Sequence, residues 1–453
     1  MSTPTAVTDP VAAPASPKRP RGLLGAVAGS TMEVFDFTIY NTFAPFFAAA
    51  FFVASPGNTT GAFLQSLAVL AVGFIARPLG SLLFGHISDT RGRRVSLYLT
   101  SLTALLGTLL IALSPTHDTI GIGAAIVLVS ARIIQGLAHG GEQPAAGAYV
   151  AEVATPRTRG AWSAWVYMSI MAGGALATLL GALLSSTVGA EALRAWAWRV
   201  PFFVGALGSV VALYLVWRLH ETEVFTETSA NVDKPSVWAE MWAARRPALQ
   251  IIGLTIGLTI AFQNWAAIGG YHIAVFHSNP AQVLWVGVVS QVLAIGALPL
   301  WGRLSDRIGR KPVTLIGFVG LALTTYPFMA FLDGSWQRMA LTMVVSFLLL
   351  SAPLSIAPAL MAELVPTSIR TIGVGFSYAL ATAVFGGTVP FLQTWISSTW
   401  GPQDFGLYVT AALVVSIVVA LRIPETRGKD LAADATTASD RTLTPAAHAT
   451  KEN

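Results

Sequence analysis

Five ionisable residues lie inside long apolar stretches of this chain: Glu33, Asp36, Arg77, Arg132 and Glu142. A charged group in an apolar medium costs free energy unless it is paired, so each of the five is a candidate functional residue. Glu33 and Asp36 are three residues apart and share one face of a helix. Because a carboxyl group removed from water binds a proton more readily, these acids could carry a proton. The two arginines could bind an anion.

Two hypotheses account for this set of charges. In the first, Arg77 and Arg132 neutralise the acids and hold the first helices together. In the second, which we favour, at least one arginine binds an anionic substrate while a carboxyl group carries a proton. Asp36 is then the first choice for the proton and Arg77 for the anion. Glu33 and Arg132 are alternatives in either role, and Glu142 is a further candidate for proton coupling.

Neutral polar side chains could contact the same substrate from the second half of the chain. His272 is better explained as a packing residue, whereas for Tyr378 substrate contact and packing are equally well supported. The full set of candidate substrate-binding residues is Arg77, Arg132, Tyr40, Gln263, Asn264, Tyr271 and Tyr378.

Long apolar segments must position these residues. The 453-residue chain is 54% hydrophobic and only 11% charged, against about 25% charged residues in an average soluble domain. Residues 247–302 contain no Asp, Glu, Lys or Arg. Apolar runs of about 20 residues cross a bilayer as helices. The sequence predicts an all-α membrane protein with twelve transmembrane helices, at 23–52, 61–85, 95–114, 119–150, 160–188, 197–218, 248–277, 280–302, 312–332, 337–362, 368–398 and 404–422.

The distribution of Lys and Arg predicts the orientation of these helices. With the N-terminus inside, Arg194, Arg199 and Arg338 face outside, Arg77 and Arg132 fall within spans, and the rest of the 27 Lys and Arg lie inside. Both termini are therefore predicted to be cytoplasmic. The predicted organisation is a disordered tail at 1–21, a six-helix bundle at 22–218, a cytoplasmic linker at 219–247, a second six-helix bundle at 248–423 and a disordered tail at 424–453.

Three motifs occur once in each half of the chain. GHISDTRGRR at 85–94 is repeated as GRLSDRIGRK at 302–311. AEVATPRTRG, which ends at Gly160, is repeated as AELVPTSIRTIG, which ends at Gly373, and HET at 220–222 is repeated as PET at 424–426. Two six-helix units in parallel orientation are the layout of one large class of transporters.

These motifs resemble those of the major facilitator superfamily over roughly residues 22–426. GHISDTRGRR is similar to the signature between spans two and three, and RIIQGLAHGGE at 132–142 is similar to the signature of span four. The span-four signature is tied to proton coupling in that superfamily, which implicates Arg132. The loop signature latches the inner ends of the two halves there, so the resemblance implies a conformational latch at Gly85, Asp89, Arg93, Arg94, Gly302, Asp306 and Arg310.

A narrower resemblance is to the metabolite:proton symporters of that superfamily. It rests on EVFDFTIY at 33–40, GFIARPLG at 73–80, LRAWAWRVPFF at 193–203 and VGFSYALATAVFGG at 374–387. The last two stretches are most similar to the α-ketoglutarate and citrate branch. The resemblance implies a multi-pass protein of a bacterial inner membrane that imports a small carboxylate with protons by alternating access.

Other functions stay open at this stage. Symport of proline, betaine or shikimate and proton-driven export of drugs or metabolites fit the same topology, whereas a membrane sensor would need a larger signalling domain than 219–247. The chain has no cysteine, no GxxxxGK[ST] loop and no His–carboxylate cluster with metal-ligand spacing, so we expect no enzyme activity, cofactor or metal. The expected partners are a small carboxylate, protons and membrane lipid, not nucleic acid, and a monomer suffices.

Overall fold

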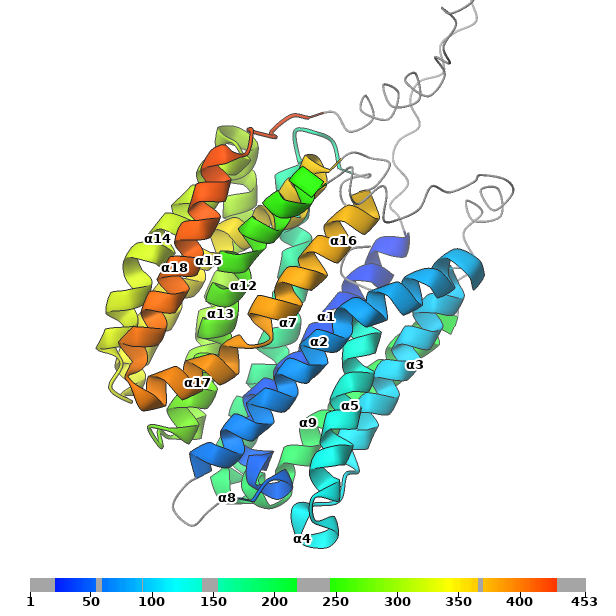
Figure 1. Ribbon diagram of the computed structural model, residues 1–453, viewed down its shortest axis with the longest axis vertical. Helices are drawn as coiled ribbons and strands as arrows, with labels where there is room; N and C mark the ends of the chain where they lie inside the picture. Colours follow the sequence, from blue (N-terminus) through cyan, green and yellow to red (C-terminus); the bar gives the residue numbers. More distant parts are fainter. Residues whose placement is uncertain are drawn as a thin grey trace, which may run out of the picture.

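The chain folds into helices along its described length. The computed structural model describes residues 21–53, 59–91, 93–140, 154–217, 245–365 and 370–429, which are drawn in colour in Figure 1. The helices of the first half are α1 (Arg21–Phe51), α2 (Thr59–Arg91), α3 (Arg93–Ala112), α4 (His117–Ile120), α5 (Gly123–His139), α7 (Arg159–Thr187), α8 (Gly189–Ala195), η1 (Ala197–Arg199) and α9 (Val200–Trp217). Those of the second half are α12 (Arg245–Ala274), α13 (Pro280–Ile308), α14 (Arg310–Phe331), α15 (Trp336–Leu364), α16 (Arg370–Ala381), η3 (Thr382–Gly386), α17 (Val389–Thr399) and α18 (Pro402–Arg422).

The helices match the predicted transmembrane segments closely. Ten described segments are long and apolar enough to cross a membrane. The shorter apolar helix α5 and the 31-residue helix α1 occupy the other two predicted positions. The predicted span 119–150 differs, because a break at Gly121, whose φ is 59°, separates α4 from α5. Residues 141–153 lie outside the described ranges, as do residues 1–20 and 430–453 of the predicted tails and residues 218–244 of the linker region. Residues 424–429, which were predicted to belong to the disordered tail, are described and follow α18.

Most of the repeated basic motif is helical, although it was predicted to be a loop between two spans. Helix α2 continues to Arg91 and helix α13 continues to Ile308, so both pass well beyond the predicted ends of their spans. In the second copy only Gly309 separates α13 from α14, and its φ of 110° is a conformation that residues with a Cβ rarely adopt. A single glycine therefore makes the turn that the motif requires.

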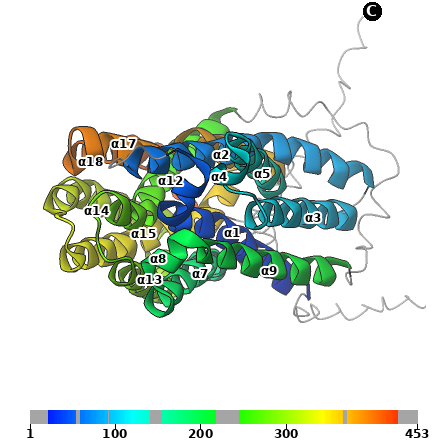
Figure 2. The ribbon, with the colours of Figure 1, turned by 90° about the horizontal axis from the view of Figure 1, so that it is seen from below.

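The helices are arranged as two bundles that meet along α7 and α13 (Figures 1 and 2). Helix α7 packs against α1 of its own bundle and against α13 and α15 of the other. Figure 1 shows the first turns of α1 and the last turns of α18 at one end of the molecule, which we call the terminal end, and α4 and α8 at the opposite end. Large apolar side chains such as Leu79 and Leu207 are exposed on the outside, as a lipid-facing surface requires.

Candidate functional site

Helix α1 places two acids inside the first bundle. Glu33 and Asp36 are 4% and 2% exposed, and they lie about one helical turn apart. They nevertheless contact different neighbours, and those neighbours define two separate clusters of polar side chains.

The first cluster is a chain of hydrogen bonds within the first bundle. Arg132 Nη1 donates to Gln135 Oε1 at 2.8 Å, Gln135 Nε2 donates to Thr108 Oγ1 at 2.8 Å, and Thr108 Oγ1 donates to Asp36 Oδ2 at 3.1 Å. We call these four residues the Asp36 network. Every bond runs from the cation toward the carboxylate, so the network connects α5, α3 and α1 and fits an ionised Asp36.

The Arg132 end of the Asp36 network is buried among residues of the first bundle. Arg132 is 2% exposed, and its guanidinium lies 4.3 Å from the centroid of the Tyr40 ring. The Tyr40 hydroxyl donates to the Ser66 carbonyl at 2.9 Å. Of the residues predicted to bind substrate, Arg132 and Tyr40 are therefore held by contacts within their own bundle.

The second cluster bridges the two bundles. Arg77 is only partly buried, and it interacts electrostatically with Glu33 of α1 and with Tyr378 of α16. Tyr378 is hydrogen-bonded through its side chain to Tyr167 of α7. We call Arg77, Glu33, Tyr378 and Tyr167 the Arg77 cluster. It combines one cation, one carboxylate and two hydroxyl groups from both bundles.

Two phenylalanine rings lie beside Arg77, and one of them, Phe37, also lies beside Arg132. The Arg77 guanidinium is 4.3 Å from the Phe74 ring centroid and 5.1 Å from that of Phe37, and the Arg132 guanidinium is 5.6 Å from the Phe37 centroid. Cations are attracted to ring faces, so both rings help to position Arg77, and Phe37 also contacts Arg132. These aromatic partners were not predicted, because Phe residues in an apolar helix carry no distinguishing signal.

Close helix packing brings the arginines together. Helices α2 and α5 approach so closely at Gly73 and Gly136 that a methyl group on Gly136 would overlap the Gly73 carbonyl. A methyl group on Gly73 would lie 3.2 Å from the Arg132 carbonyl. Small residues at these positions are therefore what allows Arg77 of α2 and Arg132 of α5 to face the same ring.

Two of the neutral residues predicted in the second half bond within their own bundle. Gln393 Nε2 donates to Asn264 Oδ1 at 2.9 Å, which ties α17 to α12. The Tyr271 hydroxyl donates to the Ser397 carbonyl at 3.5 Å. Gln263 is 5% exposed. Of the candidates in the second half, Tyr378 alone has a described interaction with charged residues of the first bundle, namely Arg77 and Glu33.

At the terminal end, the second copy of the basic motif forms an ion-pair cluster across the bundles. Glu363 of α15 pairs with Arg159 of α7 at 3.0 Å and with Arg310 of α14 at 3.5 Å. Arg310 also pairs with Asp306 at 2.7 Å. Asp306 in turn accepts hydrogen bonds from the backbone N–H groups of Gly160 and Ala161 at 2.9 and 3.0 Å, which begin α7. We call Arg159, Asp306, Arg310 and Glu363 the latch cluster.

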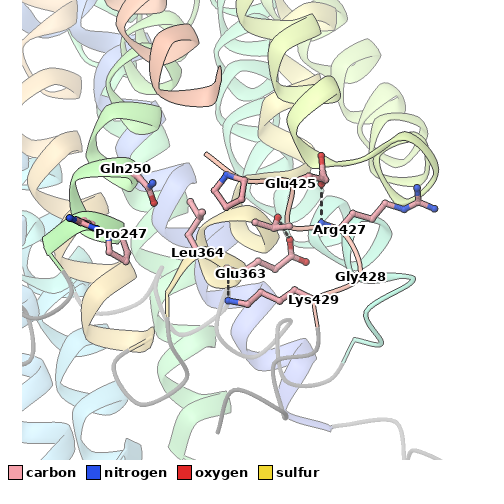
Figure 3. A pocket seen from close by; sticks show the side chains of 11 residues that line it. Pro247, Gln250, Glu363, Leu364, Glu425, Arg427, Gly428 and Lys429 are labelled. Carbon is pink, nitrogen blue, oxygen red and sulfur yellow. Dashed lines mark hydrogen bonds between the residues drawn. The ribbon is translucent and has the colours of Figure 1, made fainter. Parts of the chain in front are cut away.

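The segment after α18 packs onto the latch cluster (Figure 3). Thr426 Oγ1 donates to Glu363 Oε2 at 2.6 Å, and Lys429 Nζ donates to the Glu363 carbonyl at 3.2 Å. Partial burial acts to raise the pKa of Glu425, but backbone N–H groups, foremost that of Arg310, lower it below its usual value. A pocket of about 610 Å³ lies beside these residues. The PET repeat was the sequence signal for this segment.

The first copy of the motif is described less fully. Gly85 lies on an exposed face of α2 with open space around its Cα, whereas Gly302 lies against Gly160 of the other bundle. The side chains of Asp89, Arg93 and Arg94 lie outside the described part of the chain, and so does Glu142. Their predicted roles stay predictions.

Two family profiles and several curated relatives match the chain. The profile described as "Sugar (and other) transporter" matches residues 23–234, and that described as "Major Facilitator Superfamily" matches residues 252–451. An alpha-ketoglutarate permease of Escherichia coli (strain K12) is 36% identical over 408 residues, which cover 88% of this chain and 93% of the relative. A citrate-proton symporter of Salmonella typhi is 32% identical and covers 84% and 88%. A proline/betaine transporter of Escherichia coli (strain K12) is 29% identical and covers 93% and 86%.

A solved structure shares the fold. The proton:xylose symporter XylE bound to 6-bromo-6-deoxy-D-glucose superposes with a TM-score of 0.70, covering 92% of this chain and 98% of that one. At 17% sequence identity this likeness concerns the arrangement of the helices alone.

Proposed function

The chain belongs to the major facilitator superfamily and, within it, to the metabolite:proton symporters, and we propose that it imports a small organic acid such as α-ketoglutarate or citrate together with a proton. It is a multi-pass, proton-coupled membrane transporter rather than an enzyme. The observation that carries the carboxylate proposal is Arg77, a partly buried cation between the bundles that faces Glu33 and Tyr378.

Arg77 is the residue we propose to bind the substrate anion. Its planar guanidinium can bind a carboxylate with two parallel hydrogen bonds. Without substrate, the Glu33 carboxylate neutralises Arg77, and a substrate carboxylate would displace it. Tyr378 adds a hydroxyl group from the second bundle, so the bound anion would contact both bundles at once.

Asp36 is the residue we propose to carry the proton. While it is ionised, Asp36 accepts the Thr108 hydroxyl at the end of the chain that begins at Arg132. Protonation removes the negative charge of Asp36, so the bond that it accepts from Thr108 becomes weaker and its electrostatic attraction to Arg132 is lost. Arg132 and Arg77 share the Phe37 ring, which offers a route from the proton to the anion.

Alternating access requires that the inner ends of the bundles separate and close again. We place the terminal end in the cytoplasm, as the Lys and Arg distribution predicts. The latch cluster then joins the cytoplasmic ends of α7, α13, α14 and α15. Removing one member of a buried ion pair is costly because it leaves a buried charge without compensation, so this cluster would set the free energy of opening toward the cytoplasm.

One observation favours a second candidate, symport of a zwitterion such as proline or betaine. Glu33 and Arg77 lie together, so a zwitterion could pair its amino group with Glu33 and its carboxylate with Arg77. Relatives that transport proline and betaine cover 93% of the chain. In this alternative Glu33 binds substrate rather than competing with it.

Uptake into proteoliposomes separates the two candidates. An inwardly directed proton gradient would be imposed, and labelled α-ketoglutarate, citrate, shikimate and proline would be offered to the purified protein. We expect accumulation of a carboxylate, abolished by collapsing the gradient and by Arg77→Ala. The carboxylate proposal is wrong if proline alone accumulates, or if none of the four enters while a dye is extruded.

A further inference from the structure

Helix α16 is interrupted directly after the Arg77 cluster. Residues Thr382–Gly386 form a π-helical turn, in which the Gly387 N–H donates to the Thr382 carbonyl at 3.0 Å. Thr382 Oγ1 donates back to the Tyr378 carbonyl at 2.9 Å. A π-turn holds one residue more than a regular turn and is frequent at functional sites. The regular helix is therefore interrupted about one turn beyond Tyr378.

A side chain of the first bundle, that of Phe74, lies against the end of this turn. A methyl group on Gly387 would lie 2.5 Å from Phe74 Cβ and 2.7 Å from Phe74 Cγ. The α16–α17 backbone thus lies directly on Phe74, which is 4% exposed. On the same ring the Arg77 guanidinium lies 4.3 Å from the centroid, and the Phe37 ring packs edge-on at 4.6 Å and 79°.

We propose that Phe74 is a positioning residue that couples anion binding at Arg77 to the π-turn of α16. The inference rests on the proposed role of Arg77. A carboxylate that binds Arg77 draws the guanidinium away from the ring face, which weakens the cation–π contact. The ring is then free to tilt, and because Gly387 contacts it without an intervening side chain, the tilt changes the space available to the π-turn. In this way Phe74 connects the substrate site in the first bundle to the π-turn in the second bundle.

Phe37 provides a matched comparison. It also lies over Arg77, at 5.1 Å, and packs against Phe74. The first-bundle atoms nearest to Gly386 and Gly387, however, belong to Phe74. If aromatic contact with Arg77 were sufficient, the two phenylalanines would behave alike. If contact with the π-turn is required, only substitution of Phe74 should uncouple anion binding at Arg77 from the π-turn.

The test uses spin labels, which the absence of cysteine in the chain makes simple. Leu79→Cys on α2 and Leu380→Cys on α16 are exposed positions, and their distance distribution would be measured in lipid nanodiscs with and without α-ketoglutarate. In the otherwise unmodified Leu79→Cys/Leu380→Cys protein, we expect α-ketoglutarate to shift the distribution of distances between the two labels. Phe74→Leu in the same protein should bind α-ketoglutarate with an affinity within about threefold, but the ligand should no longer shift the distance distribution. Its maximal uptake rate should fall about tenfold with little change in KM.

Three further variants make the result decisive. Phe37→Leu should keep the ligand-induced change, and Phe74→Tyr, which retains the ring, should restore it. Gly387→Ala presses on Phe74 from the other side and should abolish the change even if Phe74→Leu does not fold. The coupling is refuted if Phe74→Leu or Gly387→Ala retains the full change, or if Phe37→Leu loses it equally. A labelled background that binds no carboxylate refutes the proposed function instead, and the coupling with it.

Discussion

The Arg77 cluster and the Asp36 network both begin on α1, yet they differ in what they connect. The Asp36 network joins α1, α3 and α5 of one bundle. The Arg77 cluster joins α1 and α2 of the first bundle to α16 of the second. When two bundles rock against each other, contacts within one bundle persist and contacts between bundles change. A transporter needs both kinds: a proton site that keeps its geometry and a substrate site whose geometry differs between states.

The largest expected effect comes from removing the cation between the bundles. Arg77→Ala should lower the initial rate of carboxylate uptake by at least about 100-fold, because loss of one partner of a desolvated charge pair costs about 2–5 kcal/mol. Arg338→Ala is the matched control, since Arg338 forms an exposed pair with Asp333 at 3.2 Å and should change uptake less than twofold. Uptake by Arg77→Ala near the wild-type rate would remove Arg77 from the substrate site.

Breaking the Asp36 network in the middle should separate transport from its driving force. Thr108→Val removes the hydroxyl that joins Gln135 to Asp36 and should lower proton-driven accumulation about tenfold, while substrate exchange stays within about threefold. Thr103→Val on the same helix removes only a local bond to the Leu99 carbonyl and serves as control. Equal loss of exchange and accumulation in Thr108→Val would point to a structural role instead.

Glu33→Gln should have a smaller effect, and in the opposite direction. If the Glu33 carboxylate competes with substrate for Arg77, its neutral replacement should lower the KM for a carboxylate about three- to tenfold, equivalent to roughly 1 kcal/mol of removed repulsion. The KM would be measured at a fixed outside pH. A higher KM for proline in the same variant would instead support the zwitterion candidate.

Removing single hydroxyl groups offers the finest comparison. Tyr378→Phe should reduce uptake about fivefold, because its hydroxyl group lies between the bundles, in the Arg77 cluster. Tyr40→Phe loses the bond to the Ser66 carbonyl and should lower thermal stability by about 1 kcal/mol while uptake stays within about twofold. If Tyr40→Phe proves the more damaging to transport, the division into two clusters does not describe their roles.

Much of the fold was predictable because bilayer physics acts on long stretches of sequence. Residues 247–302, for example, lack all charged residues and form most of α12 and α13. The identity of the charged candidates followed from the same rule. Their pairing did not, because Thr108 and Gln135 are ordinary polar residues, and only the folded helices bring them between Asp36 and Arg132.

Local features of the backbone could not be predicted from the sequence pattern either. The π-turn at Thr382–Gly386 has no distinguishing pattern in the sequence, and the contact of the adjacent Gly387 with Phe74 of the other bundle exists only in the folded chain. Likewise, the repeat of HET as PET indicated an internal duplication without revealing that Thr426 bonds to Glu363 in the latch cluster. Both features involve contacts between segments that are far apart in the sequence.

The most direct test of the central claim compares exchange with accumulation in Asp36→Asn. Proteoliposomes containing wild type or this variant would be assayed for counterflow of labelled carboxylate without a gradient, and for net accumulation with the outside acidic. We predict that Asp36→Asn retains exchange and no longer accumulates substrate, because an amide cannot take up and release the coupling proton. Accumulation by Asp36→Asn at the wild-type level would contradict the assignment of the proton to the Asp36 network.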